Sequence, residues 1–145
     1  MLTVLFRSTD PIRSVEASPL AFIYDRNATV NHRLLDMRLD GCRTYAERQG
    51  WDVAGTWTDH GDDALSSDRR PGFDRLLHAM LEASRGRTAL CLIHNWDRYA
   101  HDRPSRTTFQ QRVALAGGYT ATTFDETDET DESAVVALVG EQRSR

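Results

Sequence analysis

The chain of 145 residues is 39% hydrophobic and 28% charged, with a formal net charge of −4, values close to those of an average globular protein. This length allows one hydrophobic core and excludes a second domain of similar size. No apolar run is long enough to cross a bilayer, and MLTVLF at the start is too short for a signal-peptide core. We therefore expect a cytoplasmic protein with no membrane partner.

The first half of the chain predicts a strand, a helix and a second strand. Residues 1–18 show no sustained period and are expected to form a flexible N-terminal extension. LAFIYD, at residues 20–25, is a continuous apolar run like that of a parallel strand covered on both faces. Apolar residues then recur at helical spacing over residues 31–49, Gly50 ends that helix, and DVAGTWTD at residues 52–59 predicts the next strand.

The second half of the chain also alternates between predicted helices and predicted strands. HGDDALSSDRRPG, residues 60–72, is a polar loop long enough to indicate a function, and an amphipathic helix follows it and stops near Gly86. TALCLIH at residues 88–94 predicts a third strand. Pro104 is suited to the first turn of a further helix, and YTATTF at residues 119–124 predicts a fourth strand.

This alternation predicts an α/β fold of three layers, with a mostly parallel, four- to five-stranded sheet and helices on both faces. The folded domain is expected to span residues 19–124. Residues 125–145 are expected to form an acidic loop and the start of a short C-terminal helix.

The acidic charge is concentrated in DETDETDE, residues 125–132, which holds six of the 22 acidic residues. The remaining 16 face 18 basic residues, all of them arginine, so the rest of the chain is mildly basic. That balance permits a polyanionic partner such as DNA without requiring one. A solvated acidic loop on a neutral domain explains the same pattern.

The cysteines and histidines give no strong motif for a metal or a cofactor, and we expect neither. Cys42 and Cys91 lie in apolar patterns, so small buried side chains are a better interpretation than a disulfide. His94, Asp97 and His101 follow no strong metal-ligand spacing, and an arginine lies among them.

Charged residues follow the first and third predicted strands at the ends where ligands bind in doubly wound sheets. Asp25 and Arg26 end the first strand, and Asp97 and Arg98 follow the third. If the two strands are neighbours, these residues meet in one crevice, and Arg70 or the adjacent Arg69 enters from the polar loop. Such guanidinium groups suit a phosphodiester, with the acid assisting a leaving hydroxyl. Local pairing of Asp97 with Arg98 in a turn is the alternative.

Four segments together resemble the catalytic domain of serine recombinases, the resolvase and invertase family. They are AFIYDRNAT, LDMRLDGCRTYAERQGW, SSDRRPGFDRLL and ALCLIHNWDRYAHD, in the family's order, within residues 20–124. Family members carry a Tyr-x-Arg-x-Ser pattern, whose serine attacks a DNA phosphodiester and forms a covalent phosphoserine.

Tyr24 and Arg26 match that pattern, but the serine position holds Ala28. Thr29 does not restore the match, because members often carry a threonine directly after their serine. The resemblance also implies that Arg70 is the family's loop arginine. Asp97 and Arg98 match the family's Asp-Arg pair, which is implicated in acid catalysis and phosphate stabilisation, so Asp97 is a possible acid.

Three further departures lie at positions that contact the phosphate or organise its surroundings. The arginine expected three residues after Arg98 is His101, the glutamine of the first long helix is Arg38, and Asp63-Ala64 replaces a serine-glycine pair. An alanine methyl cannot attack phosphorus, and loss of a nucleophile can cost ~10⁶-fold in rate.

The sequence therefore predicts a serine-recombinase-like domain, related to DNA strand exchange and site-specific recombination, with impaired catalysis. It is expected to act as a weak DNA-binding module directed at phosphate, or as a partner of itself or of an intact serine recombinase. Two alternatives stay open: an active recombinase that uses Thr29 or another hydroxyl, and an inert remnant of a mobile element.

Overall fold

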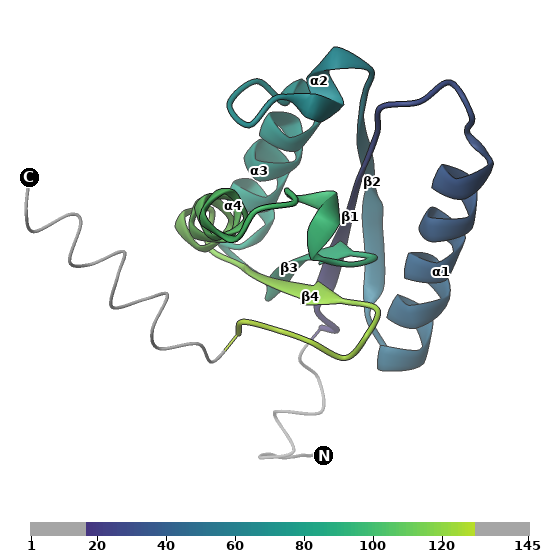
Figure 1. The fold of residues 1–145 in the computed structure, drawn as a ribbon. Helices are drawn as coiled ribbons and strands as arrows, with labels where there is room; N and C mark the ends of the chain where they lie inside the picture. The colour runs from purple at the N-terminus through teal and green to yellow at the C-terminus, as the bar shows by residue number, and fades with distance from the viewer. Residues whose placement is uncertain (1–16, 130–145) are drawn as a thin grey trace, which may run out of the picture.

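The computed structural model describes residues 17–129. The elements run in the order β1 (Leu20–Asn27), α1 (Arg33–Gln49), β2 (Asp52–His60), α2 (Asp62–Leu65), α3 (Pro71–Ala83), β3 (Ala89–Ile93), η2 (Trp96–Arg98), α4 (Arg103–Leu115) and β4 (Tyr119–Thr122) (Figure 1). The predicted N-terminal extension, but for its last two residues, and the predicted C-terminal helix lie outside the described residues.

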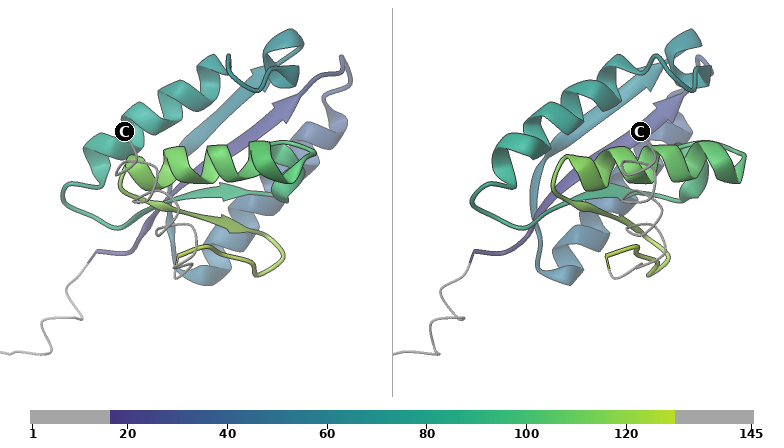
Figure 2. Two further views of the ribbon diagram at one scale, coloured as in Figure 1. Left: turned by 60° about the vertical axis from the view of Figure 1, so that its left-hand side comes forward. Right: turned by 90° about the vertical axis from the view of Figure 1, so that its left-hand side faces the viewer.

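The four described strands form one sheet in the order β2-β1-β3-β4, and every neighbouring pair is parallel. The predicted parallel α/β architecture is confirmed, and β1 and β3 are neighbours, which is the condition under which the charged residues after these two strands meet. Because all strands run the same way, their carboxyl ends meet at one edge. The arrowheads of β1 and β2 end at that edge, near α2, in Figure 2.

Helices cover both faces of the sheet, and alternation along the central strand β1 explains how (Figure 2). Ala21 and Ile23 point to the face that α1 covers, where Cys42 and Ala46 pack against them. Phe22 and Tyr24 point to the other face, into a core formed with α3 and α4. A strand buried on both sides needs a continuous apolar run, which is the pattern of residues 20–24.

The predicted helix ends agree with the backbone. Gly50 ends α1 in a left-handed conformation, with φ of 78°, and its N–H bonds to the last turn. The expected polar loop at residues 60–72 is shorter, because β2 ends at His60 and α3 begins at Pro71, and it contains the short helix α2, whose Ala64 is fully buried. Within residues 17–129, no helix combines the length and apolar character needed to cross a bilayer.

The first residues of the acidic segment fold back along β4. Thr127 forms an isolated bridge with Ala121. Asp128 accepts a hydrogen bond from the Thr120 backbone N–H at 2.7 Å, and Asp125 accepts one from the Tyr45 hydroxyl at 2.7 Å. These carboxylates have structural partners in the fold.

Both cysteines are free and buried, as predicted. Burial raises the pKa of the Cys42 and Cys91 thiols to about 12. Protonated, buried thiols react slowly, so we expect thiol reagents to label the folded protein only as it unfolds.

The same shift predicts a pH dependence. The unfolded thiols lose their protons near pH 9, whereas the folded ones hold them until about pH 12, so stability should fall as pH rises through that window. Cys42→Ser and Cys91→Ser variants, followed by urea unfolding from pH 7 to 11, test the dependence. An equal fall in stability in the serine variants would contradict the pH dependence, and fast labelling of the native protein at neutral pH would contradict the slow reaction of the buried thiols.

Candidate active site at the carboxyl edge of the sheet

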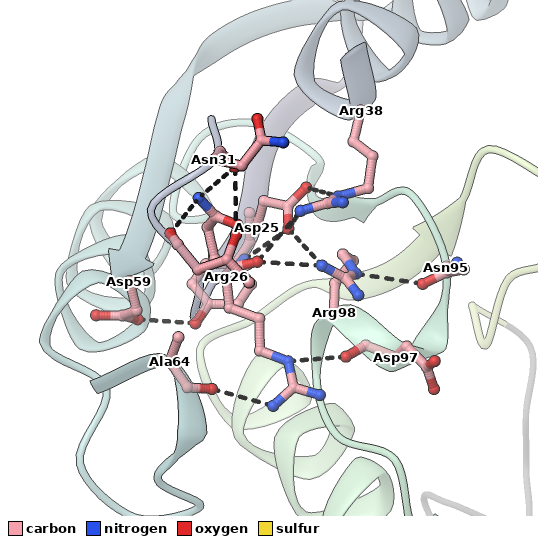
Figure 3. A network of polar contacts seen from close by, with 12 residues as sticks. Asp25, Arg26, Asn31, Arg38, Asp59, Ala64, Asn95, Asp97 and Arg98 are labelled. Carbon is pink, nitrogen blue, oxygen red and sulfur yellow. Dashed lines mark hydrogen bonds and ion pairs between the residues drawn. The ribbon is translucent and has the colours of Figure 1, made fainter. Parts of the chain in front are cut away.

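A buried carboxylate lies at the centre of this edge (Figure 3). Asp25, two residues before the end of β1, is 1% exposed. The guanidinium of Arg38 on α1 donates to both of its oxygens, at 2.8 and 3.2 Å, and Arg98 donates at 3.0 Å. The backbone N–H of Arg26 adds a bond of 2.6 Å. Two cations from different elements therefore meet on one anion.

Arg26 lies beside this centre and is 8% exposed. Its side chain donates to the backbone carbonyls of Asp97, at 2.9 Å, and Ala64, at 3.0 Å (Figure 3). Burial, and then the charges of Arg70 and Arg98, lower the pKa of the Arg26 guanidinium. Its contacts connect β1 to the loop after β3 and to α2.

Arg70 enters the same region from the loop before α3, and it is 1% exposed. Its guanidinium lies 4.4 Å from the centre of the Phe109 ring and donates to the carbonyls of Ser66, at 2.7 Å, and Arg98, at 3.3 Å. The adjacent Arg69 is exposed. Of the two candidates for the loop arginine, Arg70 is therefore the one that lies in the cluster.

The Tyr24 side chain lies in the core, where its hydroxyl donates to Asp59 at 2.7 Å. Asp59 also accepts the N–H groups of Gly72, at 2.7 Å, and Phe73, at 3.0 Å, in the first turn of α3. Burial, together with Asp59, raises the pKa of Tyr24. A Cβ at Gly72 would lie 2.6 Å from the Thr58 carbonyl oxygen, so this close approach requires glycine.

Sequence reasoning missed both central carboxylates, Asp25 as an ion-pair partner and Asp59 as a buried acceptor. The available signal was position, since each acid occurs near the carboxyl end of a predicted strand, just before a turn. The three-dimensional partners could not be read from that position.

The turn after β1 holds Ala28 and Thr29, and both are exposed. The Thr29 hydroxyl lies 3.3 Å from the Asn27 side-chain oxygen and 3.3 Å from the Asn31 carbonyl. Both partners belong to the same turn, and neither is a general base. The hydroxyl therefore has a local structural role in this arrangement.

The remaining predicted residues lie at the rim. Asp97 in η2 has a side chain 48% exposed, and the His101 ring lies 3.5 Å from its carboxylate and is 79% exposed. Asp63 on α2 is half-buried. Within residues 17–129, no group of three His, Cys, Asp or Glu side chains is arranged to hold a metal ion.

Comparison with known proteins decides the family. The sequence model described as "Resolvase, N terminal domain" matches residues 21–134, most of the chain. The chain belongs to this resolvase family. No curated protein matches the resolvase-like chain.

Solved structures support the same fold. The chain is similar to the N-terminal catalytic domain of TP901-1 integrase, at 19% identity and a TM-score of 0.63, over 86% of this chain and 94% of that one. It is similar to a resolvase family site-specific recombinase from Streptococcus pneumoniae, at 15% identity and a TM-score of 0.64, over 87% of each chain. A third similar structure is the C-terminal catalytic domain of ISC1926 TnpA, an IS607-like serine recombinase, at 19% identity and a TM-score of 0.57, over 83% of this chain and 78% of that one.

Proposed function

We propose that this resolvase-family domain has lost strand cleavage and acts as a weak, phosphate-directed DNA-binding module. The observation that carries the proposal is Ala28. It takes the place in the Tyr-x-Arg-x-Ser pattern where a serine would attack phosphorus, directly after β1 and two residues from Arg26. A methyl group offers no lone pair for attack.

The neighbouring hydroxyl gives little support to an alternative nucleophile. A hydroxyl needs an adjacent base or a lowered pKa to attack at neutral pH. Thr29 instead bonds to the Asn27 amide oxygen and the Asn31 carbonyl. We therefore regard the chain as a pseudoenzyme. Asp97 could act as an acid only in a reaction that a nucleophile begins, and that nucleophile is missing.

Charge at the carboxyl edge supports the binding role. Arg38 and Arg98 share the single carboxylate of Asp25 there, whereas Arg26 and Arg70 donate to backbone carbonyls, so positive charge is in excess. The side chains of Arg38 and Arg98 are each 16% exposed, so part of the charge reaches the surface. A phosphate backbone is the polyanion that such an edge attracts, with an affinity that falls with salt.

A second candidate is association with an intact serine recombinase or with another copy of this chain. Its support is a set of exposed apolar side chains beside Ala28 and along the start of α1: Val30 is 94% exposed, Leu34 58% and Met37 62%. Exposed apolar side chains that lie together are typical of protein interfaces. In this role the domain would bind the surface of another protein molecule, either an intact serine recombinase or a second copy of this chain, and would not need to bind DNA.

Fluorescence anisotropy with a generic DNA duplex across a salt series tests the proposal. We expect binding at low salt that weakens steeply between about 50 and 200 mM salt. Arg98→Gln should weaken binding roughly tenfold, because one guanidinium leaves the edge.

Arg85→Gln is the matched control, since Arg85 follows α3 and its side chain is 72% exposed. It should change affinity less than twofold. Circular dichroism checks that each variant is folded, and Arg38→Gln replaces Arg98→Gln if the latter unfolds. Absence of binding at any salt, or equal effects of Arg98→Gln and Arg85→Gln, would refute DNA contact at this edge and favour the partner role.

A further inference from the structure

The surroundings of Asp25 have the composition of a phosphate site. Its carboxylate accepts two N–H bonds from the Arg38 fork, one from Arg98 and one from the Arg26 backbone. Planar guanidinium groups and backbone N–H groups are also the usual ligands of phosphate oxygens. The difference is that the anion here belongs to the chain itself.

The donors come from separate parts of the fold, and the carboxylate joins them. Arg38 lies on α1, Arg98 in η2, and Asp25 on β1 between them (Figure 3). Arg38 and Arg98 also both donate to the Arg26 carbonyl, at 3.3 and 3.1 Å. That carbonyl holds the two guanidinium groups near each other independently of the carboxylate.

We propose that Arg38, Arg98 and the Arg26 N–H form an anion site of which Asp25 is the built-in occupant. In the natural chain the carboxylate keeps external phosphate out of the space that it fills, and DNA can reach only the solvent-facing parts of Arg38 and Arg98, each 16% exposed. Removal of the carboxylate opens it to a phosphate group, either inorganic phosphate or a DNA phosphodiester. The anion site does not depend on the proposed DNA binding. Only the expectation that a DNA phosphodiester enters this site rests on that proposed function.

The alternative is that these residues form a purely structural ion-pair cluster. Under both accounts, removing one partner from a buried pair leaves uncompensated charge and destabilises the fold. Only an anion site regains stability when an external anion takes the vacated position, since a ligand that binds the folded state raises its stability. Rescue by phosphate therefore separates the two accounts.

Thermal unfolding of Asp25→Ala in sodium phosphate, against sodium chloride at equal ionic strength, tests the proposal. We expect the variant to melt below the natural protein in chloride, and about 10 mM phosphate to raise its midpoint by roughly 3–6 °C. The natural protein should shift by less than about 1 °C over the same change.

Two controls define the site. Asp52→Ala removes a surface pair in which Asp52, 64% exposed, lies 2.5 Å from Arg87, and phosphate should give no rescue there. Asp25→Ala/Arg98→Gln removes a donor as well as the occupant, and its rescue should disappear. If Asp25→Ala does not fold, Asp25→Ser, whose shorter side chain also vacates the carboxylate position, replaces it, and phosphate-dependent NMR shifts replace the melting curve.

Equal phosphate responses of Asp25→Ala and the natural protein would overturn the proposal, as would unchanged rescue in the double variant. The DNA duplex forms a separate arm, in which Asp25→Ala is expected to bind about tenfold more tightly than the natural chain. Phosphate rescue without tighter DNA binding would establish the anion site and refute its use for DNA. The failure of one proposal is thus distinguishable from the failure of the other.

Discussion

Serine in place of Ala28 is expected to supply the nucleophile that the turn after β1 lacks. In Ala28→Ser, the serine oxygen would attack phosphorus, a deoxyribose hydroxyl would leave, and a phosphoserine link to DNA would form. We expect no adduct with the natural chain and a detectable one with Ala28→Ser, a difference of at least ~10⁴-fold in rate. Denaturing gels with labelled DNA, and the mass of the modified peptide, measure it.

The same experiment decides between the alternatives for the natural chain. Ala28→Gly is the matched control, because it changes the same residue without adding a hydroxyl. An adduct with the natural protein that disappears in Thr29→Val would refute the loss of cleavage and identify Thr29 as the nucleophile. A folded Ala28→Ser that forms no adduct would contradict the expectation and place a further defect in the arginine cluster.

The Asp59 carboxylate is expected to be the largest single polar contribution to stability near the site. Asp59→Ala would leave the Tyr24 hydroxyl and the N–H groups of Gly72 and Phe73 without their buried acceptor. Each unsatisfied buried group costs about 1–3 kcal/mol, so we expect three such groups to cost at least about 3 kcal/mol of unfolding free energy. That is a large share of the ~5–15 kcal/mol available to a domain.

Urea unfolding measures this loss. Asp74→Ala provides the comparison, since Asp74 also lies in the first turn of α3 but is 54% exposed and pairs with Arg112. Its loss should cost less than about 1 kcal/mol. Tyr24→Phe removes one of the three donors and should cost about 1 kcal/mol. Equal destabilisation by Asp59→Ala and Asp74→Ala would contradict the role given to Asp59.

Local patterns in the sequence were sufficient for the architecture. The continuous apolar run of LAFIYD predicts a strand covered on both faces, and the helical spacing before Gly50 predicts α1 and its end. The alternation of such elements leaves few arrangements other than a parallel sheet with helices on both faces. The sequence does not decide whether the first and third strands are neighbours, and only the strand order β2-β1-β3-β4 shows that their ends meet.

The tertiary structure alone decided which partner each charged side chain takes. Asp25 pairs with Arg38, 13 residues away, and with Arg98, 73 residues away, while Arg70 is buried over Phe109. No period in the sequence encodes such pairs, because a charge is compensated by whatever lies within a few ångströms in space. The sequence could therefore locate the arginines at one edge, whereas only the fold shows that they surround an anion supplied by the chain itself.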